Sequence, residues 1–257
     1  MNQDIEQFIV GLRRAGLRPT EKQWEVALGL DRHVLPALVD LAADTAVLIG
    51  PEPAAYGPLH ALRLLSEWHP LDGEVVERML QALPLSDPEP GAQAAFVWRQ
   101  DLPQILGGAG LNALVVARRL LLDADSAPDR RAAAAETMGY TVAIDDALGD
   151  EIVALLRGAL ATEADPYVLA YIIDTLANLG AVDAYNDVMS SYQRGAVDKG
   201  IVRAAEVRPR LLSGKLGNRM ECVRHTPAER YEQHGPYTEE QRRAMAEQYR
   251  RSQGQPR

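Results

Sequence analysis

The sequence has a single cysteine, Cys222, among its 257 residues. One thiol can form neither an internal disulfide framework nor a zinc site built mainly from cysteine. Aromatic residues make up only 5% of the chain, and no segment alternates apolar and polar residues as a half-buried strand does. Alanine and leucine, which favour helices, dominate the apolar content. The composition therefore predicts an all-α fold.

Long apolar runs and clustered positive charge are also missing. No run approaches the ~18 apolar residues of a membrane span, and residues 1–10 lack the basic start and apolar core of a signal peptide. The net charge of −9 argues against a large nucleic-acid surface, because phosphate contacts need clustered lysine and arginine. We therefore expect a cytoplasmic protein that binds neither membrane nor nucleic acid.

Motifs for catalysis or cofactor binding are absent as well. The stretch "GGAG" at 107–110 lacks the lysine that follows in a phosphate-binding loop. His225 and His234 lie nine residues apart near Cys222. A metal site is one interpretation of these three residues, and idle side chains in an irregular segment is the interpretation we favour. We assign no catalytic residue, no metal ligand and no cofactor.

Helical periodicity is what the sequence has in abundance. Apolar residues recur at spacings of three and four through most of residues 4–212, as on amphipathic helices. Short stretches rich in glycine, proline and acidic residues separate these segments and are typical of turns. We expect helices at 4–15, 19–30, 32–48, 54–68, 73–83, 92–106, 111–122, 129–144, 150–161, 166–179, 183–192 and 199–212.

Two of the expected helices align with each other. "YGPLHALRLLSEW" at 56–68 and "YVLAYIIDTLANL" at 167–179 match in apolar spacing at an offset of 111 residues, or three steps of 37. Each follows an acidic turn that contains proline, and each is preceded by another amphipathic helix. Helix pairs of this length in series resemble HEAT-type α-solenoid repeats over roughly residues 32–212. The resemblance implies an α-solenoid of stacked antiparallel helix pairs, which we place at residues 1–213.

Both aligned helices carry a row of non-aliphatic residues at the same phase, spaced four, three and four residues apart along one side. Inner helices of solenoids line a concave surface that usually binds the partner, and tyrosine and arginine are enriched where binding energy concentrates. We predict that this polar ridge is exposed and binds a partner; the alternative is an ordinary solvated side. The polar ridge consists of Tyr56, His60, Arg63, Glu67, Tyr167, Tyr171, Asp174 and Asn178.

Residues 214–257 differ in charge from the rest of the chain. They hold 9 Lys/Arg and 6 Asp/Glu, a net charge of +3, whereas the other 213 residues hold 18 and 30, a net charge of −12. Their low apolar content predicts a largely extended segment with a short helix at 239–251. The segment is expected either to stay loose and open to proteolysis or to lie across the acidic body.

These features favour a non-catalytic scaffold or adaptor that binds a protein or peptide. An acidic concave face would suit a basic partner segment. One alternative is an enzyme, because HEAT-like folds include bilin lyases and DNA glycosylases, although no residue of this chain matches their catalytic sets. The other alternative is a structural subunit of a larger complex that docks through residues 214–257. Nothing in the sequence sets the oligomeric state.

Overall fold

The computed structural model describes residues 3–83, 85 and 93–252. Every regular element in this part of the chain is a helix, and it contains no strand, so the predicted all-α fold is confirmed. None of these helices is both long and apolar enough to cross a membrane.

The helices follow one another with short connections. The α-helices are α1 (Gln3–Arg13), α2 (Glu21–Gly29), α3 (Leu35–Ala42), α4 (Thr45–Leu48), α5 (Tyr56–Leu65), α6 (Gly73–Gln81), α7 (Gln93–Gly107), α8 (Leu111–Leu122), α9 (Pro128–Ile144), α10 (Gly149–Thr162), α11 (Pro166–Asn178), α12 (Tyr185–Gln193), α13 (Ala204–Leu212), α14 (Pro227–Gln233) and α15 (Glu239–Ser252). The 3₁₀ helices are η1 (Asp31–Val34), η2 (Ser66–Trp68), η3 (Asp146–Leu148), η4 (Val182–Ala184) and η5 (Asn218–Arg224).

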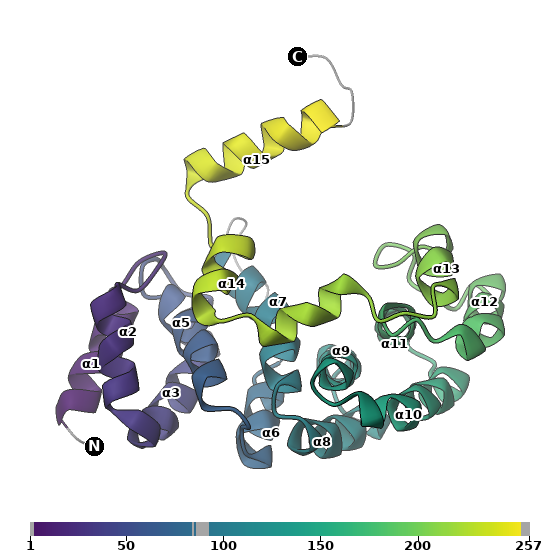
Figure 1. The fold of residues 1–257 in the computed structure, drawn as a ribbon, viewed down its shortest axis with the longest axis horizontal. Helices are drawn as coiled ribbons and strands as arrows, with labels where there is room; N and C mark the ends of the chain where they lie inside the picture. Colours follow the sequence, from purple (N-terminus) through teal and green to yellow (C-terminus); the bar gives the residue numbers. More distant parts are fainter. Residues whose placement is uncertain (1–2, 84, 86–92, 253–257) are drawn as a thin grey trace.

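The helices from α1 to α13 form a curved arrangement of two layers (Figure 1). In the inner row, α5, α7, α9, α11 and α13 contact one another in that order. In the outer row, α3, α6, α8, α10 and α12 do the same. Each inner helix therefore packs against inner neighbours and against the outer row, and the apolar core runs through both rows.

Helix α11 shows how the local sequence produces such an inner helix. Its start is set by Asp165, whose carboxylate accepts hydrogen bonds from the backbone of Tyr167 and Val168, and by Pro166 in the first turn. The helix contacts α9, α10 and α13. Coverage from several sides explains why this segment is apolar around most of its circumference. The chain leaves α11 at Gly180, whose φ of +63° is one that glycine adopts without strain.

Small residues allow the inner helices to approach closely. A Cβ atom on Gly107 of α7 would lie 2.4 Å from the Cβ of Tyr140 on α9, a separation that atoms cannot adopt. Helix α9 also buries a run of alanines at 132–135. The alanine-rich sequence of α9 is thus a requirement of close helix packing.

The chain reverses after α13 and runs back across the inner row, as Figure 1 shows. We call residues 214–237 the return segment. Within it, η5 contacts α9 and α7, and α14 contacts α5. Its side chains Met220, Val223 and Tyr231 are buried. Beyond it, α15 projects away from the two rows (Figure 1).

The expected structure of residues 214–237 needs correction. We predicted a largely extended segment, but η5 and α14 make residues 218–233 mostly helical. The loose alternative is wrong for the return segment, because its buried side chains complete the packing of the inner row. The terminal helix, predicted at 239–251, spans Glu239–Ser252.

Candidate functional site

Four residues of the polar ridge contact the return segment: His60 and Arg63 on α5, and Asp174 and Asn178 on α11. In α5, the His60 ring lies 2.6 Å from the Tyr231 hydroxyl through Nδ1 and 2.8 Å from the Gly16 carbonyl through Nε2. Arg63 donates from Nη1 to the Gly235 carbonyl at 2.6 Å. Neither His60 nor Arg63 retains any exposed surface. The predicted exposure of these two residues is wrong, because the return segment covers them.

The α11 half of the ridge anchors the start of the return segment. Asp174 accepts from Arg210 Nη1 at 2.8 Å and from Arg219 Nη1 at 3.2 Å. The Asn178 side chain donates to Asp174 at 3.1 Å and accepts from Arg210 Nη1 at 3.1 Å, and the Asn178 backbone carbonyl accepts from the Gly217 amide at 2.7 Å. These two polar residues interrupt an otherwise apolar helix because they hold a neighbouring segment of the same chain.

The remaining ridge residues differ in how far their side chains are exposed. Tyr56 is buried and donates its hydroxyl to Glu52 at 2.6 Å. Glu67 is exposed, whereas Tyr167 and Tyr171 are half-buried with their ring centroids 5.0 Å apart. The predicted exposure is therefore also wrong for Tyr56 and for the buried Asn178. Contact of the ridge with a separate partner stays a prediction.

A buried ionic cluster lies where the return segment meets α5 and α7. Asp101 on α7 accepts from Arg63 Nε at 2.7 Å and lies 2.7 Å from His234 Nδ1, with Arg230 Nη1 at 3.8 Å. Arg63, Asp101 and Arg230 have no exposed side-chain surface. The Arg63 guanidinium also lies over the Tyr231 ring, 4.2 Å from its centroid. Two buried guanidiniums thus share one carboxylate.

The cluster shifts the titration of its members in definite directions. Burial alone would raise the pKa of Asp101, but the hydrogen bond to His234 and the two guanidiniums together lower that pKa. Burial would lower the pKa of His234, but its hydrogen bonds to Asp101 and Cys222 and the charge of Asp101 together raise it. The carboxylate is therefore held ionised, and it favours the protonated form of the imidazole next to it.

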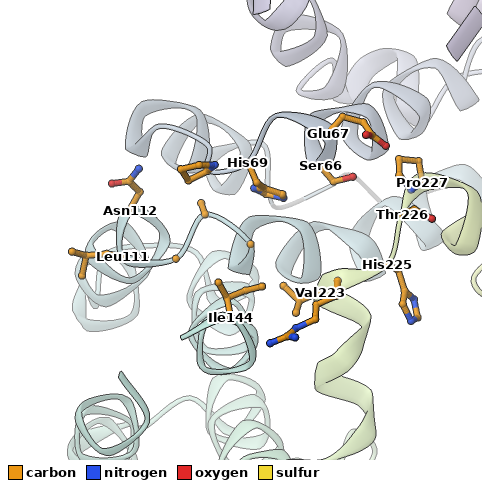
Figure 2. Close-up of a pocket in the computed structure, with 15 residues that line it drawn as sticks. Ser66, Glu67, His69, Leu111, Asn112, Ile144, Val223, His225, Thr226 and Pro227 are labelled. Carbon is orange, nitrogen blue, oxygen red and sulfur yellow. The ribbon is translucent and has the colours of Figure 1, made fainter. Parts of the chain in front are cut away.

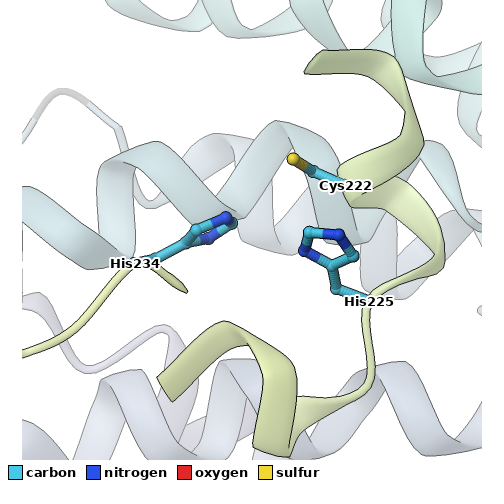
Figure 3. Close-up of side chains that lie close together, drawn as sticks. All are labelled: Cys222, His225 and His234. Atoms are coloured by element: carbon cyan, nitrogen blue, oxygen red, sulfur yellow. The ribbon is translucent and has the colours of Figure 1, made fainter. Parts of the chain in front are cut away.

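Three potential metal ligands converge beside this cluster, as Figure 3 shows. Cys222 lies in η5, His225 follows η5 directly, and His234 caps the end of α14. Ligand atoms of the three side chains all lie within 4.8 Å of one another. Helix α14 brings them together, because its N-cap Thr226, which forms a capping box with Glu229, follows His225 directly. We call Cys222, His225 and His234 the Cys–His–His trio.

In the trio, the His234 ring is oriented by a hydrogen bond, whereas the His225 ring has a buried nitrogen without a hydrogen-bond partner. The contact of His234 Nδ1 with Asp101 leaves the Nε2 side of that ring for Cys222 and His225. The Nδ1 atom of His225 is buried and has no hydrogen-bond partner. Burial lowers the pKa of His225 and so favours its neutral, ligating form. A thiol with two imidazoles can hold a metal such as zinc, or can form a thiolate–imidazolium pair.

A pocket of about 680 Å³ adjoins the trio. His69 and Ser66 lie on one side of it and Val223 and Ile144 on the other, with His225 at its edge (Figure 2). Both ring nitrogens of His69 are buried without a hydrogen-bond partner. Burial and the nearby Arg230 charge lower the pKa of His69 to about 4. The wall of the pocket therefore includes a neutral imidazole whose ring nitrogens are buried.

Acidification is expected to destabilise the fold through two buried histidines. Burial lowers the pKa of His60 to about 3, and that of His69 to about 4. The unfolded chain, with a histidine pKa of about 6.5, then binds more protons than the folded one. The stabilisation is complete above pH 6.5 and falls with decreasing pH toward each folded value, by about 1.4 kcal/mol per pH unit per histidine at most.

Urea unfolding at pH 7.5 and pH 5.0 measures this dependence. The variant His69→Gln should flatten the slope, whereas His33→Gln, which replaces an exposed histidine, should leave it unchanged. His234 acts in the opposite direction, because its raised pKa adds stability that is lost as the pH rises through that pKa. Equal slopes for the wild type and His69→Gln would contradict the assignment of His69.

Sequence reasoning weighed the trio and assigned it no role, because a separation of nine positions between two histidines does not indicate that they converge. It missed Asp101 entirely, since one acidic residue in an amphipathic helix has no local signature. Comparison with protein-family models, with curated proteins and with solved structures finds no match to this chain. Its functional assignment therefore depends on the geometry of its own side chains.

Proposed function

We propose that this chain is a HEAT-type α-solenoid that acts in the cytoplasm as a non-catalytic scaffold or adaptor for a protein partner. The contacts within the inner row and within the outer row support the solenoid, because stacked helix pairs contact mainly their neighbours. An ordered stack of this kind is a rigid frame from which a binding element can be presented.

The inner face already holds arginine side chains, and they belong to the return segment of the chain itself. Arg219 pairs with Glu136 and Asp174, and Arg230 lies beside Asp101. The charge complementarity expected between an acidic face and a basic partner is thus satisfied within the molecule. A separate partner is engaged elsewhere, and α15 is the element that the geometry presents to it.

The exposure of α15 is the observation that carries this proposal. Every described side chain of this helix is exposed, and the helix extends away from both rows (Figure 1). A single helix of this length is marginal in water without tertiary packing, and exposed charge pairs add little to its stability. It nevertheless places two large apolar side chains one turn apart, Met245 at 49% and Tyr249 at 66% exposure. A partner that covers this stripe would stabilise the helix.

The base of α15 is fixed to the body. The Tyr237 amide donates to Gln93 Oε1 at 3.0 Å, and Gln93 Nε2 donates to the Tyr237 carbonyl at 3.1 Å. These two bonds join the end of the return segment to the start of α7. The scaffold therefore sets where the helix begins, which reduces the entropy lost when a partner binds it.

Affinity capture with the full-length chain tests this function. The double variant Met245→Ala/Tyr249→Ala should reduce recovery of a specific partner at least about tenfold, equivalent to about 1.4 kcal/mol. The matched control is Leu111→Ala/Val115→Ala on α8, where both side chains are more than 60% exposed. Loss of the partner in the α8 variant, with full recovery in the α15 variant, would assign binding to the outer row and contradict the proposal.

A further inference from the structure

The Cys–His–His trio has the composition and proximity of a transition-metal site. Zinc is bound by cysteine sulfur at about 2.3 Å and by histidine nitrogen at about 2.0–2.1 Å, so ligand atoms in a tetrahedral site lie roughly 3.3–3.6 Å apart. The potential ligand atoms here lie within 4.8 Å of one another. Rotation of side chains, by about 1 Å at the ligand atoms, is enough to close the site around an ion.

The surroundings of the trio are those of a metal-binding histidine. Ligating histidines usually donate their other ring N–H to a carboxylate, which fixes the ring and makes it a better ligand. His234 has this contact, with Nδ1 2.7 Å from Asp101. His225 contributes a buried nitrogen with no other partner. An ion would satisfy that nitrogen, for which no other group of the described chain provides a bond.

Accessibility and charge also bear on the site. Cys222, His225 and His234 are each partly exposed, so an ion can enter without unfolding of the return segment. The positive charges of Arg63 and Arg230 repel an incoming metal ion, whereas the Cys222 thiolate and the Asp101 carboxylate attract it. Only an ion that binds thiolate and imidazole strongly can overcome this repulsion. Magnesium and calcium prefer oxygen ligands and are excluded on this ground.

We propose that Cys222, His225 and His234 bind one Zn²⁺ ion, with the fourth coordination position open to water or to an incoming ligand. The ion would connect η5, the turn before α14 and the end of α14. These elements make up most of the return segment, so binding would fasten the segment to the inner row. The fourth position would be available to a ligand that reaches the edge of the adjoining pocket.

Titration of the full-length, chelator-treated protein with Co²⁺ tests the site, because a thiolate bound to Co²⁺ produces a charge-transfer absorption band. We expect a band that saturates at one equivalent and is removed by Zn²⁺. Cys222→Ser should abolish the band, and His225→Ala should weaken Co²⁺ binding at least tenfold. The control variant His33→Ala replaces an exposed histidine outside the trio and should bind as the wild type does.

Melting temperatures and the rate of Cys222 alkylation distinguish a zinc site from a metal-free thiol. Because metal that binds only the folded state stabilises it, Zn²⁺ should raise the melting temperature of the wild type but not that of Cys222→Ser. Zn²⁺ should also slow alkylation of Cys222 at least tenfold. His225 is in none of the ion pairs that the described residues form with Asp101, so the helical circular dichroism of His225→Ala should match that of the wild type. Absence of the Co²⁺ band, or alkylation unaffected by Zn²⁺, would overturn the proposal in favour of a metal-free thiol. Unchanged Co²⁺ binding by His225→Ala would also overturn it, because the ion would then be held without His225.

Discussion

Replacement of Asp101 by alanine is expected to lower the free energy of unfolding by about 3–5 kcal/mol, the usual cost of breaking a buried ion pair. The carboxylate is the only anionic side chain that pairs with Arg63 and Arg230 in the described part of the chain. Without it, two guanidiniums stay buried without compensation, and His234 loses its hydrogen bond. Urea unfolding monitored by circular dichroism measures the change. Because the pKa of Asp101 is lowered, its contribution is present above pH ~4, the unfolded pKa, and is lost as the pH falls through the folded pKa.

The matched control for Asp101 is an exposed ion pair. Asp187 pairs with Arg157 at 2.9 Å, but both side chains are 40–49% exposed. Asp187→Ala should therefore change the free energy of unfolding by no more than about 1 kcal/mol. A loss below about 1 kcal/mol for Asp101→Ala would show that water or a structural change compensates the guanidiniums and that the cluster contributes little to the fold.

Removal of residues 214–257 is expected to abolish cooperative unfolding, whereas removal of residues 238–257 should leave stability nearly unchanged. The return segment buries Met220, Val223 and Tyr231, and each such side chain contributes about 1.5–3 kcal/mol. Truncation after residue 213 would also remove Arg230 and expose the inner row. The combined loss is on the order of 5–10 kcal/mol, comparable with the total stability of a typical domain. Truncation after residue 237 leaves the return segment and both helical rows intact.

Thermal unfolding of the two truncated chains, followed by circular dichroism, provides the comparison. Trypsin digestion of the full-length chain gives a second measure, because Arg242 and Arg250 in α15 are exposed whereas Arg230 is fully buried. Cleavage in α15 should precede cleavage at Arg230 by a wide margin. A chain of residues 1–213 that unfolds cooperatively at the wild-type temperature would show that the return segment is an accessory to the fold.

Much of the local structure can be predicted from the sequence alone. The predicted helix at 111–122 has the same bounds as α8, and the one at 166–179 exceeds α11 by one residue. Proline at a helix start, glycine at a helix end and apolar spacing act within a few residues. Helix bounds can therefore be predicted from them without a tertiary structure. The phase of part of the polar ridge was also predictable, because α5 presents His60 to Tyr231 and α11 presents Asp174 to Arg219, both in the return segment.

What covers the ridge was decided only by the tertiary structure. Periodicity shows which side of a helix differs from the rest, and it carries no information about the element that packs there. His60 and Arg63 have the polarity of surface residues, yet each is fully buried because Tyr231 and Gly235, more than 170 positions away, supply their partners. The few apolar residues of the return segment left open whether it is loose or lies across the body. It lies across the body, and Arg230 is buried there through polar contacts that no hydropathy pattern records.

The candidate metal site depends both on contacts between residues close in sequence and on contacts between residues far apart in sequence. A capping box and a proline, both local features, start α14 and so return His234 to the vicinity of Cys222. The partner of His234 is Asp101, 133 residues earlier in the chain. By itself, the sequence determined helices, their order and the side on which polar residues gather, because these depend on interactions between near neighbours. Only the tertiary structure could pair α7 with the return segment, because that pairing depends on how two distant surfaces fit together.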